Sequence, residues 1–526
     1  MSWSHILIRR WVVAVLLLAG TAVAGVLMGK NLPNSFIPEE DQGYCFVQIL
    51  LPDAASLQRT DAVMRKLDDV LSHTHGIQSF SGISGFSLLS NTSASYTGFY
   101  FLQLEPWDER LTPELSAKGL MQTLNQTMRK EMPEAIGFAF GPPAIPGLGT
   151  AGGFTFMLQD RSSGTVQQLM DVYDKFNVAA RKRPEIASLV TTFRPSVPQL
   201  FVDVDQERVL KQGLQFGEVY QTLQAFLGGA YVNQFNRFGR QWKVYLQAEP
   251  EYRTSIDKIN NFYVRNSKGE MSPLASLVTV KRVSGPEYTN RFQMFRSIQI
   301  NGSPSPGFSS GQAMAAMEEV AKEVLPSGFG YSWMDMSYQE EKAAGGQAIV
   351  FGICFLMVFL ILAALYESWS LPFSVLLSVP VAVLGANAGL LLRKFDNNVY
   401  AQIGLIMLIG LTAKNAILIV EFAILEHAKG KDFVEAALEG GKQRLRPILM
   451  TSFAFILGCV PLWTAKGAGA IGRKVLGSSV ITGMSAASIL GIFFVPVLFV
   501  LFERIAGKKK AHVEVGQQVA LEGGHD

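Results

Sequence analysis

The chain has 526 residues, of which 48% are apolar and only 17% are charged, and its formal net charge is +3. It is too apolar and too poor in charge for an ordinary soluble domain, and most of its basic excess lies beside apolar runs, so we expect a lipid bilayer and no nucleic acid as partner. The three cysteines and six histidines show no disulfide or metal-ligand spacing, and no catalytic Ser/His/Asp set is evident. These patterns predict no metal, no cofactor and no enzyme.

The first predicted element is an apolar run at residues 11–29, WVVAVLLLAGTAVAGVLMG. Its uncharged length and the lack of a convincing cleavage site favour a membrane anchor over a signal peptide. Arg9 and Arg10 precede the run, so the positive-inside rule places residues 1–10 in the cytoplasm and residues 30–345 outside.

Five more apolar runs in the last third of the chain bring the expected number of membrane spans to six. The connection after the fourth span and the tail at 503–526 are both basic, as expected of cytoplasmic segments. A short basic loop around Lys466 falls outside, against this rule. The five runs lie at about 346–365, 371–392, 399–424, 447–465 and 475–502, and the cytoplasmic basic residues are Lys429, Lys431, Lys442, Arg444, Arg446, Lys508, Lys509 and Lys510.

The long segment between the first two spans alternates strand and helix patterns, which predicts an α-helical membrane protein with a large α+β insert. Two βαβ-type units open the insert. In the first, the strand GYCFVQILLP and a strand near 77–80 enclose an apolar helical stripe; in the second, GFYFLQLEP and AIGFAF enclose a helix that Thr112 would cap. FVQI and FLQL match at the same point of each unit, so we interpret the units as repeats packed in one domain.

A third unit begins with the strand FTFML and a helix through Leu169. Its last helix, through Met314, is displaced, because a strand-rich insert at about 216–302 comes first. Within this insert, two strands flank RFGR at 237–240. We interpret RFGR as a hairpin tip that either contacts another subunit or is simply solvated.

Two glycine-rich segments receive different interpretations. GLGTAGG at 147–153 has the spacing of a dinucleotide-binding loop but precedes a strand instead of opening a helix, so we interpret it as a connector. SGISGFSLLSNTSASYTG at 81–98 is predicted to be a flexible loop with exposed apolar side chains, which are typical of a binding surface. With aromatic residues of nearby strands, these side chains form either a pocket for hydrophobic ligands or an ordinary core. The candidates are Phe46, Phe86, Leu88, Leu89, Phe138 and Phe140.

The sequence LTAKNAILIVEFA at 411–423 places Lys414 inside a predicted span. A charge at that depth costs about 2.5 kcal/mol or more unless it is paired, so this lysine is a functional candidate by default. Glu421 shares its helical face but lies about two turns away, and the apolar runs contain no other carboxylate. The alternative is a lysine that extends to the membrane interface. Arg444 and Thr451 share a second helical face in the same way.

Three stretches of the membrane region resemble the resistance-nodulation-division (RND) family, and in particular its hydrophobe/amphiphile efflux pumps. They are LYESWSLPFSVLL at 365–377, GLTAKNAILIVEFA at 410–423 and RLRPILMTSFAFILG at 444–458. The resemblance also includes IPEEDQG, SYQEE and FFVPV. It implies a multidrug efflux transporter, a proton antiporter in the inner membrane of a Gram-negative bacterium that confers antibiotic resistance.

The resemblance covers the C-terminal half of such a pump, whose two halves are homologous. It implies that residues 41–150 form one porter subdomain, that 151–212 and 303–334 form a second, and that 213–302 form a docking subdomain. Residues 346–502 would be the five remaining spans. We expect this chain either to be completed by a separate N-terminal half or to be a fragment.

The same resemblance assigns Lys414, Arg444 and Thr451 to a proton relay. The acidic members of that relay belong to the N-terminal half, where two aspartates pair with the lysine. Without that half, we do not expect this chain to pump.

For the substrate, the resemblance assigns the loop around Gly85 and Phe86 to a switch between two drug pockets. Leu88 stands where the family has a second phenylalanine, and Ser81 replaces another pocket aromatic, so the substrates need not be the same. The implied substrate-binding residues are Phe46, Gly85, Phe86, Leu88, Phe138, Phe140 and Arg194, the last at the entrance.

The resemblance also implies partners: a homotrimer of complete protomers, a periplasmic adaptor protein, an outer-membrane channel and hydrophobic drugs. One rival function is export of a lipid or another hydrophobic metabolite by the same machinery. From a different class, the chain could be a non-pumping membrane-anchored binding or assembly subunit that retains the fold.

Overall fold

The computed structural model describes residues 7–344, 346–369 and 371–505. Most of the expected cytoplasmic segments 1–10 and 503–526, with Lys508, Lys509 and Lys510, lies outside these described residues.

The chain forms two compact units. One comprises Met1–Thr192 and Thr289–Asp526, and the other is Phe193–Tyr288. The second unit begins and ends earlier than the segment 213–302 that we expected to form the docking subdomain.

Six helices among the described residues are long and apolar enough to cross a membrane, which confirms the expected number. The third is interrupted just before Pro380, a residue that has no backbone N–H for a helical hydrogen bond. The fifth begins well before 447, because the basic segment around Arg444 continues the helix. The spans are α2 (Trp11–Asn31), α10 (Gln347–Tyr366), α11 (Leu371–Leu376) with α12 (Val379–Leu392), α13 (Val399–Ala428), α14 (Phe433–Trp463) and α15 (Ala470–Ile505).

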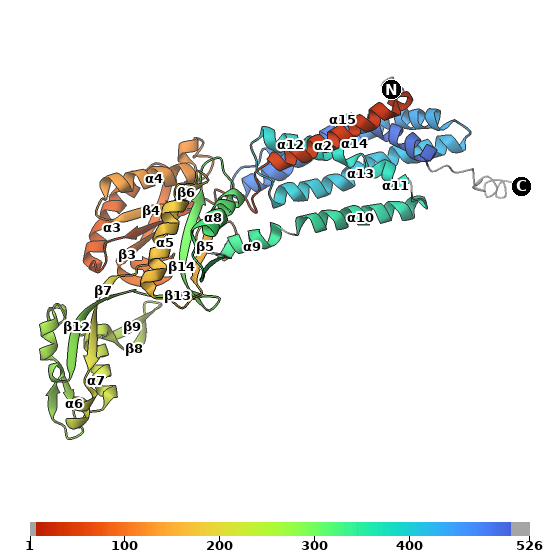
Figure 1. The fold of residues 1–526 in the computed structure, drawn as a ribbon. Helices are drawn as coiled ribbons and strands as arrows, with labels where there is room; N and C mark the ends of the chain where they lie inside the picture. The colour runs from red at the N-terminus through yellow and green to blue at the C-terminus, as the bar shows by residue number, and fades with distance from the viewer. Residues whose placement is uncertain (1–6, 345, 370, 506–526) are drawn as a thin grey trace, which may run out of the picture. The chain divides into compact units, whose positions relative to one another are not determined.

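Helices α12 to α15 pack side by side (Figure 1). Their core includes Val420 of α13, Ile448 of α14 and Phe499 of α15, all buried. Small residues allow close approach, since a Cβ on Gly440 of α14 would lie 2.7 Å from the backbone nitrogen of Ala423 in α13. In contrast, Leu362 is the only buried residue among the described side chains of α10.

Residues 44–140 form an antiparallel sheet with the strand order β2-β3-β1-β4. The two strands that flank each helix are not hydrogen-bonded neighbours, because a strand of the other unit lies between them, which is the split βαβ arrangement. The helices cover one face of the sheet (Figure 1), where Val47 and Ile49 pack with Leu67 and Leu124. The elements are β1 (Tyr44–Leu50), α3 (Leu57–Ser72), β2 (Ile77–Ser87), β3 (Thr92–Leu104), α4 (Ala117–Glu131) and β4 (Ile136–Phe140).

The predicted start of α4 was wrong. Thr112 makes no capping hydrogen bond and precedes a separate 3₁₀ turn at Pro113–Leu115. The hydroxyl of Ser116 instead accepts a hydrogen bond from the backbone N–H of Gly119 at 3.1 Å, so α4 begins at Ala117. Ser116 satisfies an N–H group that has no partner inside the helix.

The predicted flexible loop at 81–98 was also wrong. Strands β2 and β3 extend through it and leave only a turn at 88–91. Cross-strand pairs such as Ile83 opposite Phe99 outweigh the low strand propensity of the glycines and serines. Leu89 is buried in the turn rather than exposed.

A second sheet has the order β15-β5-β14, with β6 and β13 both paired to β14. With its two helices it repeats the topology of the first sheet, and each helix is capped by a Ser or Thr in a capping box. Residues 193–288 are inserted between β6 and β13. The elements are β5 (Phe154–Asp160), α5 (Val166–Ala180), β6 (Ile186–Val190), β13 (Asn290–Phe292), β14 (Phe295–Pro304), α8 (Ser310–Val324), β15 (Phe329–Met334) and α9 (Asp335–Ala344).

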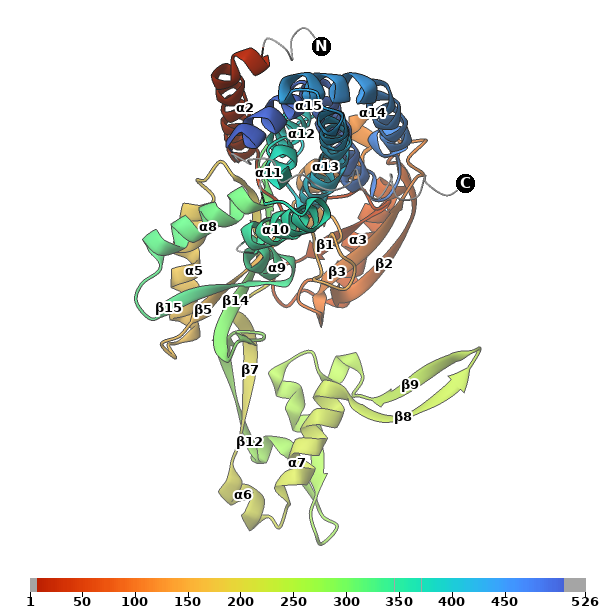
Figure 2. The same cartoon turned by 90° about the vertical axis from the view of Figure 1, so that its right-hand side faces the viewer.

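The inserted unit has its own small core, with Val209, Val219 and Leu274 fully buried. Two of its strands form a hairpin that extends away from the rest of the unit (Figure 2) and is exposed along nearly its whole length. Phe238 and Gly239 at its tip both have positive φ, as a type I′ turn requires. The elements are β7 (Val197–Val204), α6 (Gln206–Lys211), α7 (Phe216–Leu223), β8 (Ala230–Arg237), β9 (Arg240–Leu246), β10 (Tyr263–Arg265), β11 (Met271–Pro273) and β12 (Val278–Gly285).

Candidate functional site

One face of α13 is exposed from the start of the helix to its end. Its residues recur every three or four positions for most of its length, which is the spacing of a single helical face. No atom lies within 4 Å of the position that a Cβ on Gly410 would take, so nothing described covers the helix one turn from Lys414. The exposed face consists of Ile403, Met407, Gly410, Lys414, Glu421, Leu425 and Ala428.

A buried polar contact joins α13 to α14, and the sequence patterns did not predict it. Asn415 Nδ2 donates a hydrogen bond to Ser452 Oγ at 3.3 Å, and both side chains are buried. Lys414 and Thr451 each precede one member of this pair by one residue. In antiparallel helices this offset turns both side chains to the same side of the contact, and both are exposed there. Lys414 and Thr451 therefore lie on the same side of the α13–α14 pair.

Arg444 lies seven residues before Thr451 on the same helical face. Its Cζ is 3.5 Å from the ring centroid of Phe422 on α13, and its Nε is buried without a hydrogen-bond partner. Neither Lys414 nor Arg444 forms an ion pair with any described residue, and Glu421 lies about 10 Å along the helix from Lys414. These two cations thus have no ion-pair partner within the described chain.

The second candidate site is the face of the first sheet opposite α3 and α4. Phe46 of β1 lies across from Phe101 and Phe140 in the strand register, and side chains two residues apart on a strand point to the same face. The structure thus gathers all four phenylalanines that the sequence singled out, together with three aromatic residues that it did not. This aromatic layer consists of Tyr44, Phe46, Phe86, Phe99, Phe101, Phe138 and Phe140, with neighbouring ring centroids between 5.3 and 6.1 Å apart.

The other predicted substrate residues lie in three different settings. Gly85 occupies a β-bulge with φ of +83°, a conformation that favours glycine. Leu88 is half-buried at the start of the turn at 88–91. Arg194 belongs to the other compact unit, where burial lowers the pKa of its guanidinium. Its part in a substrate entrance stays a prediction.

Gln48 lies within the aromatic layer, opposite Phe99 on β3 and Phe138 on β4. Its side chain is 0% exposed. Its Nε2 donates a hydrogen bond to Gly98 O at 3.0 Å, whereas its Oε1 is buried without a partner. An unpaired buried acceptor costs about 1–3 kcal/mol, so this oxygen would gain a hydrogen bond from a ligand that displaces the side chains covering it. A polar residue in the middle of the strand CFVQIL was the sequence signal for it.

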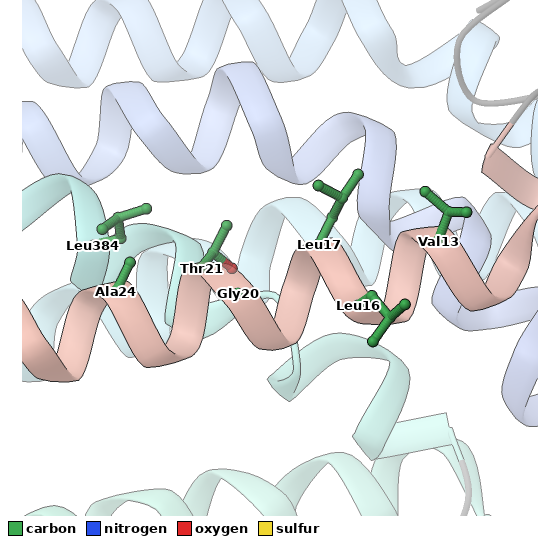
Figure 3. A pocket seen from close by; sticks show the side chains of 7 residues that line it. All are labelled: Val13, Leu16, Leu17, Gly20, Thr21, Ala24 and Leu384. Atoms are coloured by element: carbon green, nitrogen blue, oxygen red, sulfur yellow. The ribbon is translucent and has the colours of Figure 1, made fainter.

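A shallow groove on α2 contains none of the predicted site residues. Figure 3 shows its lining side chains, which come from α2 and from Leu384 of α12, and its volume is about 410 Å³. The one hydroxyl in the groove, on Thr21, donates its hydrogen bond to Leu18 O. With no free polar group to orient a ligand, the groove is an apolar surface of a membrane span.

Comparison with known proteins identifies relatives over nearly the whole chain. Residues 3–503 match the AcrB/AcrD/AcrF family. The multidrug/solvent efflux pump membrane transporter MepB of Pseudomonas putida is 40% identical over 97% of this chain and 48% of its own length. The multidrug export protein AcrF of Escherichia coli is 41% identical over 93% of this chain and 47% of its own length. The chain therefore spans about half the length of the curated relatives that it matches.

Proposed function

Because the chain belongs to the AcrB/AcrD/AcrF family, whose members compared above are membrane transporters, we propose that it is the C-terminal half of a proton-driven RND exporter. Its substrates are hydrophobic and amphiphilic compounds, taken from the periplasm or the membrane and passed to an outer-membrane channel. In this proposal the six spans lie in the inner membrane of a Gram-negative bacterium and residues 30–345 lie in the periplasm.

The observation that carries the proposal is the pair of unpaired cations, Lys414 and Arg444, beside the exposed face of α13. A second set of helices that bears carboxylates would bury this face and supply the missing counter-charge. Protonation of such a carboxylate weakens its attraction for Lys414, which creates a two-state element that protons can bias. The membrane potential supplies roughly 2.3 kcal/mol per charge per 100 mV for this movement. Thr451 belongs to the same relay through its position beside Lys414.

Replacement of Lys414 is the test of this proposal. Export is lost if the chain takes part in pumping, whereas a non-pumping membrane subunit tolerates the change. The complementary half has to be present in that experiment, since the described residues supply no acidic partner.

The aromatic layer is the proposed surface for the substrate. We expect Phe138→Ala to change the export of bulky aromatic compounds relative to small aliphatic ones by about tenfold, because the aromatic layer loses one of its rings. The measurement is a panel of minimum inhibitory concentrations at matched protein levels. Phe154, which is 2% exposed in the second sheet, provides the contrast: Phe154→Ala should lower the amount of protein. A similar loss of protein for Phe138→Ala would instead assign Phe138 to ordinary core packing.

Gln48 gives the proposed pocket a preference for ligands with an N–H or O–H group. A suitable probe pair is N-phenyl-1-naphthylamine, which has one N–H donor, and its N-methyl derivative, which has none. We expect Gln48→Leu to reduce the ratio of their export rates by about threefold to tenfold, the effect of one lost hydrogen bond. Gln103→Leu, on an exposed residue of the same sheet, should leave the ratio unchanged. An unchanged ratio in Gln48→Leu would refute this preference.

The assembly that we propose is a homotrimer of complete protomers with a periplasmic adaptor and an outer-membrane channel. The exposed β8–β9 hairpin supports it. A two-stranded ribbon is only marginally stable when it is isolated in water, and this one exposes Phe235, Trp242 and Tyr245. A contact with a neighbouring subunit would bury these aromatic side chains.

A further inference from the structure

The segment at residues 33–43, here called the connector, runs from the end of α2 to the start of β1. It contains the whole of the sequence IPEEDQG at 37–43, one of the stretches that resemble the family. Its residues form hydrogen bonds with the ends of membrane helices and also with helices of the two sheets. The connector therefore contacts both the membrane helices and the helices that pack on the sheets.

On the membrane side, the connector holds the first turns of two helices. The carboxylate of Glu40 accepts hydrogen bonds from the backbone N–H groups of Ile471 at 3.1 Å and Gly472 at 2.6 Å. These groups belong to the first turn of α15, where N–H groups have no partner within the helix. A carboxylate there is also favoured by the helix dipole.

The connector reaches the start of α13 as well. The backbone N–H of Asn397 donates to Pro33 O at 2.8 Å, and that of Val399 donates to Phe36 O at 3.1 Å. Val399 is the first residue of α13, the helix that carries Lys414.

On the side of the sheets, Asp41 performs the corresponding task. Its carboxylate accepts hydrogen bonds from the guanidinium of Arg110 at 2.8 and 3.0 Å and from the backbone N–H of Ala117 at 3.0 Å. Ala117 is the first residue of α4. In addition, the hydroxyl of Ser309, the N-cap of α8, donates to Asn34 O at 2.6 Å.

We propose that the connector transmits movement of α13 and α15 to α4 and α8 during transport, with Glu40 as its main positioning residue. Glu40 and Asp41 are neighbours in sequence, yet their carboxylates hold the N-termini of two different helices, one in the membrane and one beside the first sheet. Glu40 binds backbone N–H groups of α15, and Asp41 binds the backbone N–H of Ala117 together with the buried guanidinium of Arg110. A shift of α15 is therefore transmitted closely to the start of α4. This inference depends on the proposed transport function.

The test is the coupling between proton flow and export. The transporter, with its complementary half, is reconstituted in vesicles that contain a pH-sensitive dye, and proton flux and substrate export are measured together. We expect Glu40→Ala to lower export by about tenfold and to lower proton flux much less, so that more protons cross per exported molecule. Glu40→Gln keeps one acceptor oxygen and should recover part of the export.

Glu39 provides the matched control, because its carboxylate is exposed and forms no described contact; Glu39→Ala should export normally. Parallel losses of export and proton flux in Glu40→Ala, or no loss of either, would overturn the inference. Lys414→Ala separates this failure from that of the proposed function. If Lys414→Ala is inactive and Glu40→Ala is normal, only the inference fails; if Lys414→Ala exports normally, the proposed function fails.

Discussion

Replacing Lys414 with alanine is expected to abolish drug export in cells that also contain the complementary half. The ammonium group of Lys414 is the only positive charge on the exposed face of α13. An ionised acidic partner attracts this group and a protonated one releases it, so removal of the group eliminates the two-state element. We expect resistance to exported drugs to fall to that of cells without the transporter, with protein levels unchanged. Minimum inhibitory concentrations and immunoblots of membranes provide the measurement.

Lys442→Ala is the control for this variant, since Lys442 is an exposed lysine in the N-terminal third of α14. It should leave resistance intact. Full resistance in Lys414→Ala would exclude the proton relay and favour a non-pumping subunit that retains the fold.

Replacing Arg110 with alanine is expected to weaken the first sheet and its helices by about 3 kcal/mol, because it leaves Asp41 without its charged partner. The Arg110 side chain is 1% exposed, and its Nη1 lies 2.8 Å from Asp41 Oδ2. Hydrogen exchange reports this local stability. We expect the protection of backbone amides in α4 to fall by about a hundredfold, which corresponds to that free energy.

Arg65→Ala removes an ion pair on α3, which packs on the same sheet. It should lower the stability of that sheet and its helices by less than about 1 kcal/mol, because exposed pairs contribute little. The Arg65 side chain is 78% exposed. Equal protection in the two variants would show that the contact of Arg110 with Asp41 does not stabilise α4. Burial by itself raises the pKa of Asp41, but hydrogen bonds from Arg110, Ala117 and Gly43 outweigh it and leave the pKa below its ordinary value. The stabilisation is therefore complete above the unfolded-state pKa and is lost as the pH falls through the folded-state pKa.

The membrane spans and the central strands could be predicted from the sequence. Long apolar runs indicate helices that cross a lipid bilayer, and alternating apolar and polar residues indicate strands of a sheet with one buried face. The start of α4 could not, since Thr112 and Ser116 are both acceptable caps and tertiary packing decides between them. Strand register explains why Gln48 was missed. Its position between Phe99 and Phe138 depends on which residues of three strands lie opposite one another, and no single strand contains that information.

The membrane site could be predicted only in part, because contacts between helices, like the register between strands, depend on more than one element. A lysine within an apolar run is evident in sequence, and Lys414 is indeed on an exposed face. The contact between Asn415 and Ser452 requires knowledge of how two helices are rotated against each other, which a pattern along one helix does not give.

The insertion of residues 193–288 into the second sheet has a consequence for biogenesis. The first sheet uses strands from one continuous stretch, 44–140, so its contacts are short in sequence and it can fold soon after that stretch is synthesised. Strand β5 must wait for β14 and β15, which follow the whole inserted unit. Pairing over such separations is slow. Until then β5 is an unpaired edge strand with apolar residues such as Phe156, which is buried in the folded sheet. During synthesis this edge is where we expect chaperones to act.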